Sequence, residues 1–188
     1  LASTHALREA GLLPEGAIAR FNTRSGLLTA VWQGSWIELN FPARPSAPAE
    51  TPAGLLEALG VSSARGVQAF HNDYLVELED EQTVRNLKPD FARILQLPVR
   101  DVIVTTRGQG SGYDFVSRMF VPAMGINEDP VTGSAHCLLA PYWSQKLGKS
   151  EFLAYQASKR GGELRLRLLG ERVSISGQAV TVFLAELD

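Results

Sequence analysis

The chain has 188 residues, of which 45% are hydrophobic and 20% are charged, with 18 basic and 20 acidic side chains. This balance is typical of a soluble globular protein, and it offers no basic surface for nucleic acid or an anionic membrane. No stretch approaches the roughly 18 apolar residues that a membrane span requires. The single cysteine, Cys137, excludes an internal disulfide, so we expect a reducing, cytoplasmic environment.

The first ten residues, LASTHALREA, show the apolar spacing of a helix, but no capping residue stands in front of them. They lack the basic start and apolar block of a signal peptide. We therefore expect the chain to begin inside a helix of a longer protein, with the missing N-terminal segment as a partner.

Short alternating runs follow the opening helix, and turn residues separate them. They predict three strands, over residues 17–26, 27–34 and 35–42. Residues 42–54, PARPSAPAETPAG, have no periodicity and are typical of a linker. We therefore expect residues 1–46 to be the C-terminal remnant of a first domain plus linker, and residues 47–188 to be a second domain.

The second half alternates between strand and helix patterns. The predicted elements are a helix over 53–60, strands over 65–70 and 74–79, one or two helices over 80–97 broken at Pro89, and strands over 100–108 and 113–122. Residues 133–148 form a helix that is apolar on almost all sides, so we expect it to be buried. The last 38 residues alternate in four runs, which predicts an antiparallel curl.

These elements predict an α+β fold with two similar domains, each a curled, mostly antiparallel sheet around a central helix. Only the helix and the last strands of the first domain are expected here, so that domain is truncated.

The stretch GINEDPVTGSAHC, residues 125–137, places Thr132, Gly133 and Ser134 where a loop enters the buried helix. The first N–H groups of a helix have no internal partner, and together with the helix dipole they favour an anion. The alternative is simple capping, by Thr132 or by Asp129 with Pro130 at the first helical position. Because Glu128 and Asp129 together exceed what capping requires, we expect a proton acceptor beside an anion pocket.

Three strings carry a family resemblance: DFVSRMFVPAMGINEDPVTGSAHCLLAPYW, QASKRGGELRLRL and VSISGQAVTVFLAEL. In this order they resemble the phenazine-biosynthesis PhzF-like family, and LASTHAL is similar to the end of that family's Gly-His-Ala-Thr-Leu-Ala-Ser helix start. The resemblance implies the diaminopimelate epimerase-like fold, with the active site in the cleft between two similar domains. Pairing as a homodimer is also implied by the family alone.

The same resemblance implies an isomerase that moves a proton on a small carboxylate-bearing metabolite, with neither metal nor organic cofactor. Asp129 matches the family's catalytic aspartate, and Gly133 and Ser134 match the helix start that holds the substrate, with Thr132 and His136 beside them. The family's glutamate and Gly-His pair would precede Leu1. The alternative is a non-catalytic protein that binds a ligand or a partner in the same cleft.

Other reactive residues have simpler interpretations. Cys137 follows the Thr-Gly step by four residues and is expected in the core, and His136 is open to the same structural interpretation. Neither His5 nor His71 has a second ligand at metal spacing, so no metal site is expected.

Two further motifs stay outside the expected site. RGQGSG, residues 107–112, leads into a strand rather than a helix, so it is expected to be a mobile loop and not a dinucleotide site. Arg118 and Arg160 could each orient a carboxylate or be surface cations.

Overall fold

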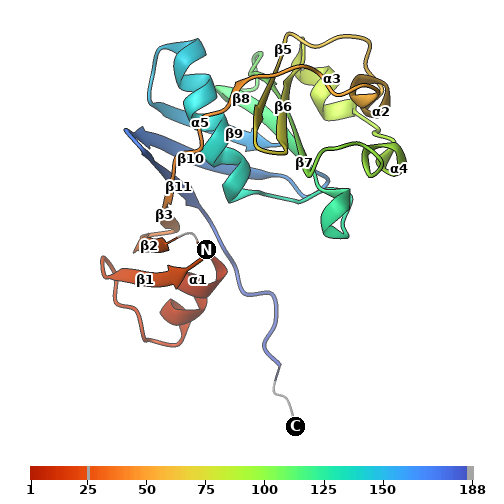
Figure 1. Ribbon diagram of the computed structural model, residues 1–188. Coiled ribbons are helices and arrows are strands. Elements are labelled where there is room, and N and C mark those ends of the chain that lie inside the picture. Colours follow the sequence, from red (N-terminus) through yellow and green to blue (C-terminus); the bar gives the residue numbers. More distant parts are fainter. Residues whose placement is uncertain (25, 186–188) are drawn as a thin grey trace.

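The computed structural model describes residues 1–24 and 26–185, and within them eleven strands form one sheet in the order β1-β2-β3-β11-β10-β9-β8-β7-β6-β5-β4 (Figure 1). The strands are β1 Ile18–Thr23, β2 Gly26–Gln33, β3 Trp36–Pro42, β4 Ala47–Pro48, β5 Gly66–Phe70, β6 Asp73–Glu77, β7 Asp101–Arg107, β8 Phe115–Phe120, β9 Glu151–Gln156, β10 Gly162–Leu169 and β11 Arg172–Gly177.

Most neighbouring strands are antiparallel, and the parallel neighbours in the described sheet are β6 with β7 and β8 with β9. Each of these two connections contains helix, because a chain that returns to run parallel needs a crossover. The helices are α1 Ala2–Glu9, α2 Leu55–Leu59, α3 Glu81–Asn86, α4 Phe91–Ile94, the 3-10 turn η1 Pro122–Met124, and α5 Gly133–Leu147. The predicted mostly antiparallel α+β architecture is confirmed.

Helix α5 is the central helix of the larger part of the molecule, and it packs against β10 and β11. Its residues from Ala135 to Trp143 are all buried, as its uniformly apolar sequence predicted. The ring of Trp143 stacks on that of Phe115 from β8, with centroids 5.6 Å apart. The N-terminus of α5 is therefore fixed relative to the sheet.

Residues 1–46 have a small core of their own around Ala30 and Ile37, and α1 begins at Ala2 without a side-chain cap. They do not form a separate sheet, because β3 pairs with β11 from Ile37 with Gly177 to Pro42 with Arg172. The proline-rich stretch is also tied down: Ser46 donates to Gln68 at 2.6 Å.

The fourth alternating run, residues 178–188, is the part of the curl that the structure does not form. None of residues 178–185 lies in a strand, so the prediction is wrong for these residues, and residues 186–188 lie outside the described chain. The apolar side chains of residues 178–185 are mostly exposed, since Val182 and Leu184 keep 86% and 91% of their surface. Alternation produces a strand only where a neighbouring strand offers backbone partners.

In the described part of the chain, no helix is both long enough and apolar enough to cross a membrane.

Candidate active site at the start of α5

The N-cap of α5 is Thr132, in extended conformation, so the capping alternative with Asp129 as N-cap and Pro130 at the first helical position is wrong. The Thr132 side chain does not cap the helix either. Within the described residues, the backbone N–H groups of Gly133 and Ser134 have no hydrogen-bond acceptor. These two N–H groups are therefore free to donate, and the anion site at this helix start stays a prediction.

Asp129 is joined to Thr132 and to Gln156 by a chain of hydrogen bonds. The Gln156 amide Nε2 donates to Thr132 Oγ1 at 3.0 Å, and the Thr132 hydroxyl donates to Asp129 Oδ2 at 2.5 Å. A hydroxyl has one proton, so receiving a bond from Gln156 leaves that proton for Asp129. One carboxylate oxygen of Asp129 is thus fixed in direction.

Gln156 also fixes the backbone of this loop. Its Nε2 donates to the Asp129 carbonyl at 2.7 Å, and its Oε1 accepts from the Thr132 N–H at 2.8 Å. The side chain is completely buried. Sequence reasoning missed this residue, although a polar side chain at an inward-facing position of alternating strand β9 was the signal that could have found it.

The turn between β9 and β10 holds the same loop from another side. Ser158 Oγ donates to the Pro130 carbonyl at 2.7 Å and accepts from the Gly161 N–H at 3.0 Å. A methyl group on Gly162 would lie 2.4 Å from Val131 Cγ2, so the backbone of β10 packs directly on Val131. Gly161 and Gly162 therefore have two roles: they form the turn, and they allow β10 to pack closely against the Asp129 loop.

Glu128 does not have the role that we expected from the pair of carboxylates. Its Oε1 accepts from Arg118 Nε at 2.7 Å and its Oε2 from Arg118 Nη2 at 3.0 Å. Arg118 is buried, and its Nη1 also donates to the Leu87 carbonyl at 2.8 Å. Arg118 is thus not a surface cation, and both carboxylate oxygens of Glu128 are engaged by it in an ion pair.

His136 lies inside the fold, which does not fit the direct substrate contact expected for it. The side chain is fully buried, Nδ1 lies 2.7 Å from the Thr132 carbonyl, and Nε2 has no partner. Because a carbonyl only accepts, Nδ1 carries the proton. Burial lowers the pKa of His136 to about 4, and the bond to Thr132 opposes this shift. His136 therefore supports the N-cap residue from behind as a neutral ring.

Cys137 is a core residue, as expected. It is buried, its Sγ lies 3.4 Å from the Gly133 carbonyl, and burial raises the pKa of the thiol to about 11. Since the thiolate is the reactive form, this cysteine is not placed for nucleophilic or base chemistry.

The loop with the sequence RGQGSG, residues 107–112, is held at two points by one carboxylate. Glu81 Oε2 accepts from the Gln109 N–H at 3.0 Å and from Ser111 Oγ at 2.8 Å. The loop joins β7 to β8, two antiparallel strands. This connection gives no helix N-terminus for a dinucleotide phosphate.

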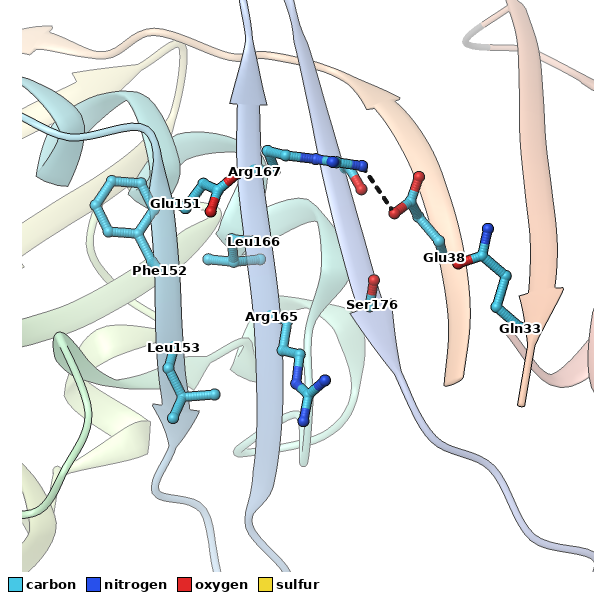
Figure 2. A pocket seen from close by; sticks show the side chains of 10 residues that line it. Gln33, Glu38, Glu151, Phe152, Leu153, Arg165, Leu166, Arg167 and Ser176 are labelled. Carbon is cyan, nitrogen blue, oxygen red and sulfur yellow. Dashed lines mark hydrogen bonds and ion pairs between the residues drawn. The ribbon is translucent and has the colours of Figure 1, made fainter. Parts of the chain in front are cut away.

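Two pockets differ in their relation to Asp129. One, of about 590 Å³, adjoins the Asp129 loop and is lined by Asn127, Glu128, Pro130, Ser158, Lys159 and Arg160. The other, of about 500 Å³, is lined by residues of β2, β3, β9, β10 and β11 (Figure 2). There Arg167 points toward Glu38 and pairs with it at 3.2 Å, so the charges are partly satisfied within the sheet.

Comparison with known proteins matches residues 1–185 to the phenazine biosynthesis-like protein family, PhzC-PhzF. An uncharacterized isomerase of Halalkalibacterium halodurans is 49% identical over 189 residues, which cover 100% of this chain and 71% of that protein. An uncharacterized isomerase of Pseudomonas aeruginosa is 51% identical over 86% of this chain and 61% of its own length.

Among solved structures, a PhzF-family phenazine biosynthesis protein of Enterococcus faecalis superposes with a TM-score of 0.86 at 35% identity, over 95% of this chain and 67% of that one. Sequence pattern, relatives and fold agree over nearly the whole chain. The chain therefore belongs to the PhzC-PhzF family of phenazine biosynthesis-like proteins.

Proposed function

We propose that this chain carries part of the active site of an isomerase or epimerase that moves a proton on a small carboxylate-bearing metabolite, without a cofactor. The observation that carries the proposal is the placement of Asp129, whose carboxylate is oriented by Thr132 next to the open N–H groups of Gly133 and Ser134. The names of the isomerase relatives support the reaction class.

The chemistry follows from this placement. The start of α5 binds the substrate carboxylate through the N–H groups of Gly133 and Ser134 and through the helix dipole. The Asp129 oxygen that faces away from Thr132 exchanges a proton with a carbon of the substrate. A second acid/base group donates its own proton to another carbon or to the opposite face, while the proton taken up stays on Asp129 until the next exchange. The family resemblance implies a glutamate upstream of Leu1 as this second group.

The test uses the full-length protein in D₂O with a panel of small carboxylates, and follows the loss of carbon-bound protons by NMR. In Asp129→Asn, the amide oxygen still accepts from Thr132 but cannot take up a proton. Exchange should fall about 100-fold or more, while the melting temperature changes little. Asp129→Ala should also lose the bond to Thr132, at about 1 kcal/mol of stability.

Normal exchange in Asp129→Asn would refute the catalytic role, because a purely structural aspartate tolerates the amide. Saturable binding of a carboxylate without any exchange in the wild-type protein would favour the non-catalytic alternative, a ligand-binding protein that uses the same helix start. Thr132→Ser is the matched control, since it keeps the hydroxyl that orients Asp129.

A further inference from the structure

The pocket beside the Asp129 loop has no role in the proton transfer described above. Its volume is about 590 Å³, and Glu128 and Pro130 are among the residues that line it. Both are chain neighbours of Asp129, so their Cα atoms lie about 3.8 Å from that of Asp129. A molecule in this pocket would contact the loop that carries Asp129, although the Asp129 side chain itself does not line the pocket.

The charges around this pocket are unbalanced. Its one carboxylate, Glu128, is neutralised through both oxygens by Arg118. Lys159 and Arg160 also line the pocket and are exposed, and neither makes an ion pair within residues 1–24 and 26–185. The lining therefore has a net positive charge, with Asn127 as an additional hydrogen-bond donor.

The two cations stand on a turn that is fixed to the Asp129 loop. Ser158 binds the Pro130 carbonyl and the Gly161 N–H, and Gly162 packs on Val131. Gly161 has a φ of +71°, a conformation that favours glycine, and a methyl group there would overlap the Tyr155 hydroxyl. The backbone that presents Lys159 and Arg160 is thus already ordered, which lowers the entropy cost of binding.

We propose that this pocket is an oxyanion subsite, which binds a carboxylate or phosphate group beside the reaction centre. Arg160 offers a planar fork of donors and Lys159 a point charge, and both suit such groups. The oxyanion is the second acidic group of a dianionic substrate, an identification that rests on the proposed function, or it is a free anion that binds independently.

The first measurement is binding of inorganic phosphate to the full-length protein, followed by NMR shifts of the Asn127 and Ser158 amides. The test variant is Lys159→Ser with Arg160→Ser. The matched control is Lys88→Ser with Arg107→Ser, which removes two exposed cations that do not line the pocket. We expect at least tenfold weaker binding in the test variant and unchanged binding in the control. Equal weakening in both variants, or no shifts at the pocket in the wild type, would overturn the subsite.

The second measurement separates the two sources of the anion. If the subsite holds part of the substrate, exchange of dicarboxylates or phosphorylated carboxylates should show a raised KM in the test variant, with monocarboxylates unaffected. If phosphate binds the pocket but the KM of every dianionic compound is the same in the test variant and the wild type, the occupant is a free anion. Phosphate binding needs no turnover, so an inactive protein that still binds phosphate there refutes the proposed function alone.

Discussion

Gly162 provides a sharp test of how the Asp129 loop is held. Its φ lies outside the left-handed region, so alanine costs no backbone strain, and Gly→Ala would ordinarily stabilise by about 0.4–1 kcal/mol. Here the new methyl group would lie 2.4 Å from Val131 Cγ2 and 3.3 Å from Cγ1. Overpacking of this kind costs about 1–3 kcal/mol, so we expect a net loss of about 1–2 kcal/mol.

Removing the opposing methyl groups should reverse the effect. Val131→Ala opens the space that the added methyl group of Gly162→Ala needs, so the double variant should regain most of the stability lost in the single one. A favourable coupling of about 1–2 kcal/mol between the two changes is expected. Gly66→Ala is the matched control, because a methyl group on this other strand-initial glycine would meet its nearest atom, the Tyr142 hydroxyl, at 3.9 Å.

The assay is urea unfolding of the wild type, the two single variants, the double variant and the control. In a parallel thermal unfolding experiment, the same loss of stability should lower the melting temperature of Gly162→Ala by about 2–8 °C for a chain of this size. If Gly162→Ala is as stable as Gly66→Ala, or if Val131→Ala brings no recovery, the close packing of β10 on the loop is not what holds it.

Three further predictions concern residues around the same loop. Gln156→Leu should destabilise the protein by about 2–4 kcal/mol in urea unfolding, since it leaves the Thr132 N–H and the Asp129 carbonyl without a partner, whereas a loss below about 1 kcal/mol would contradict this. The pKa of His136 is lowered to about 4, so below pH 6.5 the unfolded chain takes up a proton that the folded one does not. Stability should therefore fall by up to about 3 kcal/mol from pH 7 to pH 4, and the fall should be smaller in His136→Phe, while equal pH profiles would exclude His136 as the cause. Cys137, buried and with a raised pKa, should react with iodoacetamide only after unfolding, and rapid labelling of the native protein at pH 7 would contradict its core position.

Local patterns were sufficient for most of the fold. The helix predicted over residues 133–148 is α5 Gly133–Leu147, because its apolar sequence and its terminal glycine are both local features. The strands of the second half lie within a few residues of their predicted limits. The strand predicted after Gly177 does not form, for a non-local reason. Alternation shows which side chains would share one face of a strand, but a strand also needs a neighbouring strand as its hydrogen-bond partner.

The candidate site was predictable where it is contiguous in the sequence. Asp129, Thr132 and Gly133 lie within five residues, so one motif was enough to group them. Arg118 and Gln156 act from two other strands, and no local pattern shows that one neutralises Glu128 while the other holds Asp129. The motif alone could not show that one of its two carboxylates is paired, because the partner of Glu128 lies on a strand outside the motif.

Asp129 is supported from two sides: its N–H donates to the Met119 carbonyl of β8 at 3.0 Å, and β9 with the turn that follows it holds the rest of the loop. Gln156 holds its backbone and the hydroxyl that orients its carboxylate, and Ser158 holds the next residue, Pro130. The position of the carboxylate therefore depends on the β9–β10 hairpin as well as on β8. If Asp129 transfers a proton as proposed, changes in the hairpin core should lower kcat without any contact to the substrate, because proton transfer is sensitive to displacements of about 1 Å. Changes at Lys159 and Arg160, whose side chains are exposed and take no part in this packing, should act on binding instead. The β9–β10 hairpin thus contains two kinds of residue, those whose change should lower kcat and those whose change should weaken binding. The motif at residues 125–137 alone does not distinguish these two effects.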